Sequence, residues 1–125
     1  MADDERYRKG LANRAKVFGE EGEVRRKAFE AASPDFARFV TESVFGELYE
    51  RKGIDDETRE TIILAILCTL GRDGEFEHHA HAALNLGMTK EDIREIIMVC
   101  AYYAGGPNAV GATKASLNVF KARGI

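Results

Sequence analysis

Ile62-Ile63-Leu64-Ala65-Ile66-Leu67-Cys68 is the longest uninterrupted apolar run in the chain. Asp55 and Asp56 precede it, and acidic side chains at such a position cap a helix and complement its dipole. Because consecutive apolar residues cover the whole circumference of a helix, we expect this helix to be buried on all sides. A chain of 125 residues can rarely surround one helix completely. The run therefore indicates either a central core helix of one molecule or a helix that is covered in an oligomer.

The rest of the chain is typical of further helices, separated by glycine and proline signals. These predictions rest on the spacing of apolar residues. They also rest on the helix start at Ser33-Pro34 and on the capping-box pattern at Thr89-Lys90-Glu91-Asp92. Further helices are expected over residues 5–18, 23–32, 34–53, 75–86, 91–104 and about 107–123. A turn is expected at residues 19–22. No segment alternates polar and apolar residues convincingly, so the sequence predicts an all-α bundle of about six to seven helices. No linker divides the chain, and we expect one domain over residues 1–125.

Charge, hydropathy and the cysteine pattern exclude several classes of function. The formal net charge is −3 and the basic residues are scattered, which argues against nucleic acid as a partner. Residues 1–8 are polar and charged, so no signal peptide is expected, and no apolar run is long enough to span a membrane. Cys68 and Cys100 form neither a CxxC motif nor a zinc pattern. Two reduced core thiols in a cytoplasmic protein are the expected reading.

All three histidines lie on one predicted helix, within Glu75-Phe76-Glu77-His78-His79-Ala80-His81. On a helical wheel His79 falls in the middle of the apolar face, and Glu75 lies one turn earlier on the same face. An imidazole beside a carboxylate, held against a core, can be tuned to exchange a proton near neutral pH. A hydrogen-bonded core histidine without any catalytic task fits the same pattern.

Glu60 is a further ionisable residue that falls on an apolar row, beside Ile63, Leu64 and Leu67. If its helix packs antiparallel against the histidine helix, their faces meet. The rise along a helix nevertheless leaves Glu60 and His79 at heights that differ by roughly 8 Å. A direct pair would need a crossing angle or a bridging water. The alternative is an exposed carboxylate near the start of its helix.

Metal and thiol chemistry find less support in the sequence. Glu75-x-x-His78 has the spacing of one helix of a di-iron site, but no second Glu-x-x-His motif exists. We therefore expect no metal, with His78 and His81 exposed or at a subunit contact. Neither cysteine lies near the histidines in sequence, and neither has an obvious activating partner.

Six stretches of the chain resemble, in order and spacing, the γ-carboxymuconolactone decarboxylases. They lie at residues 10–19, 39–47, 53–55, 59–72, 79–87 and 103–107. Together they cover nearly the whole chain, and the ordered set resembles the carboxymuconolactone decarboxylase family. The resemblance implies an all-helical fold related to alkylhydroperoxidase D and assembled as a homohexamer.

The same resemblance separates this chain from the peroxidase branch of the superfamily. That branch carries a Cys-x-x-Cys seven and four residues before its histidine, where this chain has Arg72 and Glu75. The redox dithiol is therefore absent. Glu60 falls where the peroxidase branch keeps a relay glutamate, which favours a functional Glu60.

The activity that the resemblance implies is the cofactor-free decarboxylation of 4-carboxymuconolactone, or a similar small carboxylated lactone, in the catabolism of aromatic compounds. The product would be 3-oxoadipate enol-lactone. We expect His79 to donate the proton, with Glu75 or Glu60 setting its protonation, and Arg14 to bind a substrate carboxylate. His81 and Tyr103 are the other expected substrate-binding residues. A peroxidase that uses Cys68 or Cys100, or an oligomeric binding protein without catalysis, are the alternatives.

Overall fold

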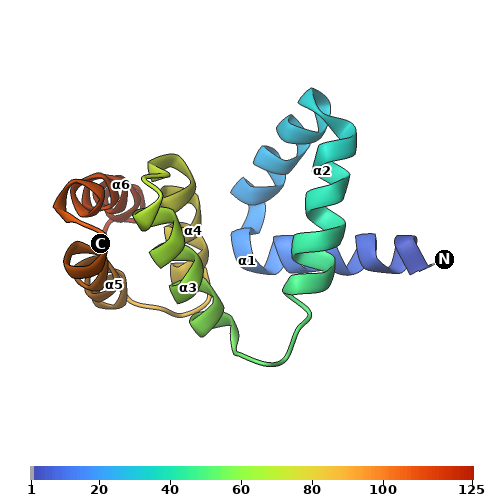
Figure 1. Ribbon diagram of the computed structural model, residues 1–125. Helices are drawn as coiled ribbons and strands as arrows, with labels where there is room; N and C mark the ends of the chain where they lie inside the picture. Colours follow the sequence, from blue (N-terminus) through green and yellow to red (C-terminus); the bar gives the residue numbers. More distant parts are fainter. Residues whose placement is uncertain (1) are drawn as a thin grey trace. The chain divides into compact units, whose positions relative to one another are not determined.

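The computed structural model describes residues 2–125, and the side chains from Asp4 onward. It confirms the all-α class: 84% of the chain is helical, and no strand occurs among residues 2–125. The chain divides into two compact units, an N-terminal unit that runs to Ile54 and a C-terminal unit, Asp55–Ile125. Figure 1 shows them in blue to green and in green to red. The expectation of a single domain over residues 1–125 stays a prediction. No helix of the described residues is both long and apolar enough to cross a bilayer.

The N-terminal unit begins with one long, bent helix, α1 (Ala2–Ala32). It bends at Gly19, whose φ of 67° lies in the left-handed region that glycine tolerates, and Figure 1 shows the two arms of the bend. The turn predicted at residues 19–22 is therefore a kink at Gly19. Gly22 lies inside the second arm, where a Cβ atom would fall 2.2 Å from the Cβ of Phe18.

Helix α2 (Pro34–Val40) starts after Ser33, as predicted, and continues directly into a π-helical segment, η1 (Thr41–Leu48). Helical periodicity predicts that this helix lasts until residue 53, but its regular part ends at Leu48. The wider π-helical turns were not predicted. They lie where η1 crosses α1 at two glycines. A Cβ on Gly10 would fall 2.0 Å from the carbonyl oxygen of Thr41, and one on Gly46 would fall 2.2 Å from that of Arg6.

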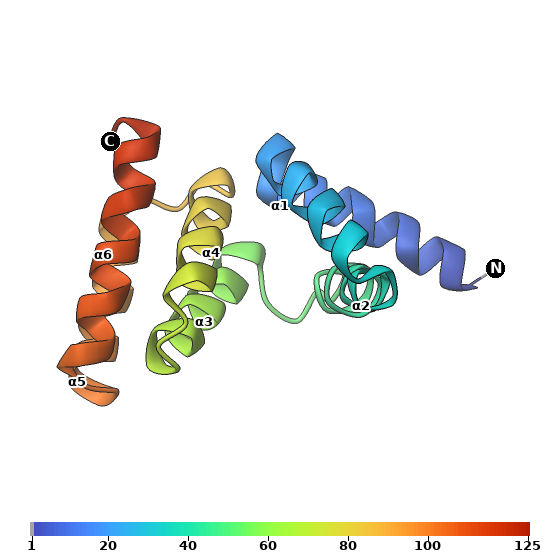
Figure 2. The same ribbon diagram turned by 90° about the horizontal axis from the view of Figure 1, so that it is seen from above.

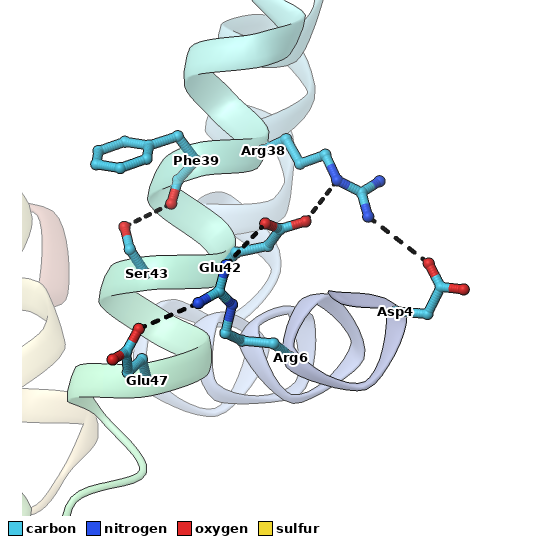
Figure 3. A network of polar contacts seen from close by, with 7 residues as sticks. All are labelled: Asp4, Arg6, Arg38, Phe39, Glu42, Ser43 and Glu47. Carbon is cyan, nitrogen blue, oxygen red and sulfur yellow. Dashed lines mark hydrogen bonds and ion pairs between the residues drawn. The ribbon is translucent and has the colours of Figure 1, made fainter. Parts of the chain in front are cut away.

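An ion-pair network joins the start of α1 to α2 and η1 (Figure 3). Arg6 lies 3.4 Å from Glu42 and 3.3 Å from Glu47, and Arg38 pairs with Glu42 and with Asp4. The arginines are about half exposed, so pairs of this kind contribute little free energy each.

The C-terminal unit consists of four helices that match the predicted ones closely. These are α3 (Asp56–Thr69), α4 (Asp73–Asn85), α5 (Lys90–Tyr103) and α6 (Gly106–Arg123). Asp55 caps α3 through the backbone N–H of Thr58, and Thr89 with Asp92 forms the predicted capping box of α5. Helices α3 and α4 lie side by side, as do α5 and α6 (Figure 2). The core between them contains fully buried side chains from every helix, including Leu64, Phe76, Ile93, Ala112 and Val119.

Helix α3 is not buried on all sides, so that prediction is wrong for the chain by itself. Leu64 and Cys68 are buried, whereas Ile62, Ile66 and Leu70 are 46%, 51% and 63% exposed. The exposed residues recur every fourth position and therefore form one row along the helix. The other three helices of this unit cover the opposite side of α3, and this apolar row faces away from them.

Candidate active site

Two of the three ionisable residues that the sequence places on apolar helix faces, Glu60 and His79, meet in the C-terminal unit. Glu60 of α3 lies with its Oε2 atom 3.0 Å from Nδ1 of His79 on α4. The Glu60 side chain is fully buried, and that of His79 is 14% exposed. The predicted difference in height along the helices is overcome without a bridging water. The structure thus places a carboxylate and an imidazole in direct contact at the edge of the apolar core.

This contact determines which ring nitrogen of His79 can exchange a proton with a ligand. An ionised Glu60 can only accept a hydrogen bond, so the Nδ1 atom of His79 must carry the proton that it donates. The carboxylate then fixes the ring orientation, and it stabilises the imidazolium whenever Nε2 is also protonated. A partly buried histidine with such a partner can act as a general acid through Nε2.

Glu75, the other expected partner of His79, is exposed. The side of α4 one turn before His79 is occupied instead by Phe76, which is completely buried. Glu75 belongs to the first turn of α4, where a carboxylate interacts favourably with the helix dipole. The prediction that Glu75 shares the core-facing side with His79 is therefore wrong.

The other two histidines of α4 have contacts of their own. His78 packs edge-on against the ring of His79, with centroids 5.6 Å apart. Nδ1 of His81 accepts a hydrogen bond of 3.0 Å from Nε of Arg123. Nη2 of the same arginine donates to the carbonyl oxygen of His81. Because a guanidinium only donates, the proton of a neutral His81 ring lies on Nε2. Among the described residues, no group of three or more His, Cys, Asp or Glu side chains is arranged to hold a metal ion.

Tyr103, expected to bind substrate, ends α5 with 93% of its surface exposed. Among the described residues it makes no contact with His79 or Glu60. The structure therefore brings together His79 and Glu60, and leaves Tyr103 at the surface.

Arg14 belongs to the N-terminal unit and is only 9% exposed. Its Nη1 donates a long hydrogen bond of 3.5 Å to Oγ1 of Thr41, and its Cζ lies 4.8 Å above the ring centre of Phe45. Its Nε is buried without a hydrogen-bond partner, and Arg14 forms no ion pair within the described residues. Burial lowers the pKa of Arg14, and nearby Arg26 lowers it further. A buried cation without an acid is costly unless an anion is added.

The sequence predicted no role for Thr41 or Phe45, although the position of Thr41 on a buried row of its helix could have indicated one. They lie one turn apart on a row that also contains the buried Ala37. A hydroxyl in the middle of such a buried row needs a polar partner, which here is Arg14.

The two cysteines are buried free thiols, as expected. The thiol of Cys68 lies 3.7 Å from the carbonyl oxygen of Asn108, and that of Cys100 lies 3.8 Å from that of Ala65. Burial, together with the hydrogen bond to Cys100, raises the pKa of Cys68 to about 12. Since the thiolate is the reactive form, Cys68 is a poor nucleophile at neutral pH.

The chain is similar in sequence to proteins of a known family. A sequence model of the carboxymuconolactone decarboxylase family matches residues 34–117, a span that includes Glu60 and His79. The 4-carboxymuconolactone decarboxylase of Acinetobacter baylyi is 36% identical over 126 residues, covering 100% of this chain and 94% of that protein. The nitrosuccinic acid decarboxylase of Metarhizium robertsii is 30% identical over 118 residues, covering 88% and 80%. An uncharacterized protein of Methanocaldococcus jannaschii is 27% identical over 86 residues, covering 69% and 79%.

Proposed function

The chain belongs to the carboxymuconolactone decarboxylase family, and we propose on that premise that it removes CO2 from 4-carboxymuconolactone, or from a similarly small carboxylated lactone, without a cofactor. The observation that carries the proposal is the buried Glu60–His79 pair, in a chain similar over its whole length to a named decarboxylase. The two named relatives act on different acids, and decarboxylation is the step they share. The reaction yields 3-oxoadipate enol-lactone and belongs to the cytoplasmic catabolism of aromatic compounds.

The substrate supplies its own electron sink, which removes the need for a cofactor. The bond between the ring carbon and its carboxylate breaks, and CO2 leaves. The electron pair moves through the ring double bond to the lactone carbonyl oxygen, which becomes an enolate. A proton then adds to carbon and completes the product. The protein has to orient the lactone, exclude water from the departing carboxylate, stabilise the enolate and supply that proton.

His79 is the proposed proton donor, and Glu60 is the residue that positions it. The imidazolium gives its Nε2 proton to the enolate carbon and is reprotonated from solvent. Glu60, at 3.0 Å from Nδ1, stabilises the charged ring before transfer and keeps Nε2 as the only nitrogen that exchanges. The small exposed fraction of His79 supports contact with a ligand while most of the ring stays shielded.

Arg14 is the proposed ligand of a substrate carboxylate. Its guanidinium is buried and lacks an acid partner among the described residues, so a carboxylate from the substrate would supply the missing charge. His81 and Tyr103 remain weaker candidates for substrate contact, because His81 is already bonded by Arg123 and Tyr103 is exposed.

We also propose that the chain forms a homo-oligomer, the hexamer that the family resemblance implies. The support is the exposed apolar row on α3, next to a hollow of about 270 Å³ lined by Ala65, Ile66, Thr69 and Leu70. Exposed apolar surface of this kind marks an interaction site in soluble proteins. Light scattering of the purified protein tests the assembly. Ile66→Lys should reduce the mass of the particle, and an unchanged mass would exclude this row as the interface.

The test of the activity is a direct assay with 4-carboxymuconolactone, followed by CO2 release and by detection of the enol-lactone. Turnover in the presence of EDTA and without added cofactor supports the proposal. Binding of the lactone without CO2 release would indicate a binding protein instead. The alternative, a thiol peroxidase, has less support, because Cys68 and Cys100 are both buried and burial raises the pKa of Cys68.

A further inference from the structure

We propose that the N-terminal unit contains a carboxylate-binding site, in which Thr41 and Phe45 hold the guanidinium of Arg14 so that its Nε edge makes a forked pair with a carboxylate. The inference rests on the proposed function, since it names how that function's carboxylate would be bound. It adds two positioning residues, both on the π-helical segment η1.

The first step is the geometry of the guanidinium. Its five N–H groups form a fixed planar fork, and a carboxylate can take two of them along one edge. Nη1 of Arg14 is directed to Oγ1 of Thr41, and the ring of Phe45 covers the guanidinium. Nε is buried and has no partner among the described residues. Nε is therefore a buried donor without an acceptor in the described part of the chain, and we propose that a ligand carboxylate supplies that acceptor.

The second step is the rigidity of the support. Thr41 is 1% exposed and Phe45 is 5% exposed. The methyl group of Thr41 lies against Gly10, where an added Cβ would come within 2.9 Å of it. That contact restricts the rotation of Thr41, so that its hydroxyl points toward Arg14, one turn further along α1. Phe45 is held in turn by the ring of Phe18, at 5.6 Å between centroids.

The backbone of η1 is also fastened to α1 beside this site. The side-chain amide of Asn13, the residue before Arg14, donates a hydrogen bond of 2.7 Å to the carbonyl oxygen of Phe45. The same amide bonds Oε2 of Glu50 at 2.9 Å. These bonds fix η1 against α1, and with it the two side chains that hold the guanidinium.

The third step is the charge around Arg14. Arg26 and Arg25 are near enough to lower its pKa, while Glu23 raises it. Glu23 is already committed, because both of its carboxylate oxygens accept hydrogen bonds from Arg26 at 3.0–3.2 Å. The adjacent acid is therefore bonded to Arg26 and not to Arg14. This arrangement fits an anionic ligand from outside.

Calorimetric titration with succinate, a small dicarboxylate, tests the site without requiring turnover. Wild-type protein should bind succinate. Thr41→Val keeps the shape of the side chain but removes the hydroxyl, and should weaken binding about 3- to 10-fold. Thr41→Ser should restore it. Arg14→Lys keeps the charge but loses the fork, and should weaken binding about tenfold or more. Thr113→Val on α6 is the matched control, because it removes a hydroxyl that bonds the carbonyl oxygen of Ala109 in the other unit, away from Arg14.

The outcomes separate this inference from the function on which it rests. Absence of succinate binding, or wild-type affinity in both Thr41→Val and Arg14→Lys, overturns the carboxylate site, whatever the decarboxylase assay gives. If Thr41→Val fails to fold, Arg14→Lys still decides whether the fork is used. In an active enzyme, Thr41→Val should raise KM for the lactone more than it lowers kcat. A loss confined to kcat would contradict a role in binding.

Discussion

The two units of the molecule each bury an ionisable side chain, but they treat it in opposite ways. In the C-terminal unit, Glu60 is completely buried and is bonded by His79 at 3.0 Å. In the N-terminal unit, Arg14 is almost as deeply buried, yet no carboxylate pairs with it among the described residues. A buried charge is costly unless it is paired. Glu60 therefore has its partner within the chain, whereas Arg14 would be paired only when an anion binds from outside.

The difference also appears in the backbone. The C-terminal unit consists of regular, well-capped helices, whereas the N-terminal unit has a kink at Gly19 and the π-helical segment η1. Such π-helical turns often lie at functional sites. Here η1 supplies Thr41 and Phe45, whose side chains contact Arg14. The regular unit thus holds the proposed proton donor, and the irregular unit holds the proposed anion site.

The largest effect is expected from His79→Ala in the C-terminal unit. Loss of the proton donor should lower kcat by about 10²- to 10⁴-fold, with a smaller change in KM. Steady-state kinetics with 4-carboxymuconolactone measures both. His78→Ala, which removes the neighbouring ring, is the matched control and should have a much weaker effect. An active His79→Ala enzyme with wild-type kcat would remove His79 from the mechanism.

The next largest effect separates the two carboxylates that the sequence places near His79. Glu60→Gln keeps the shape of the buried side chain and removes its charge, so kcat should fall by about 10²-fold. Glu75→Gln, at an exposed position, should lower kcat far less. The reverse order of the two variants would assign the positioning of His79 to Glu75.

Without substrate, a variant in each unit should change the free energy of unfolding in opposite directions. Glu60→Gln disturbs a satisfied pair and should lower the free energy of unfolding by about 1–3 kcal/mol. Arg14→Met replaces an unpaired buried cation by an apolar chain and should raise that free energy by roughly 1 kcal/mol. Denaturant titration measures both changes. A destabilised Arg14→Met protein would mean that the fold already satisfies Arg14, and the contrast between the units would disappear.

The smallest expected effect compares the helix starts of the two units. Asp55 accepts a hydrogen bond from the Thr58 amide, whereas Ser33 makes no side-chain cap bond. Hydrogen bonds from Thr58 hold the pKa of Asp55 below its ordinary value of 3.8. A depressed acid pKa stabilises the fold above 3.8, and this stabilisation is lost as the pH falls through the folded pKa.

Asp55→Ala should therefore destabilise the protein at pH 7, and its difference from wild type should shrink as the pH falls below 3.8. Ser33→Ala should have little effect at either pH. Thermal unfolding at pH 7 and at pH 3 measures both variants. Equal losses for the two variants at pH 7 would contradict the capping geometry.

The sequence predicted the regular unit better than the irregular one, for physical reasons. Helix starts at Asp55 and Thr89 follow from local side-chain chemistry, so the helices of the C-terminal unit are confirmed within a few residues. The π-helical turns of η1 depend on a close crossing at Gly10 and Gly46, which no local pattern reveals. The apolar run of α3 left open whether one molecule or an oligomer covers the helix, because a sequence does not show how many neighbours a helix has.

The candidate site shows the same limit. The apolar rows around His79 and Glu60 identified both residues, but their direct contact depends on how α3 packs against α4. A helical wheel placed Glu75 on the core side, but the structure leaves Glu75 exposed. Arg14 was found through family resemblance, and its contacts with Thr41 and Phe45 required the fold of the N-terminal unit.

A double-mutant cycle on the rate of CO2 release tests the proposed proton-donating pair most directly. Wild type, Glu60→Gln, His79→Ala and the double variant are compared at saturating 4-carboxymuconolactone. If Glu60 acts through His79, wild type turns over and the double variant is no slower than His79→Ala alone. A double variant slowed by the product of the two single effects, or a wild-type protein that releases no CO2, would contradict the account.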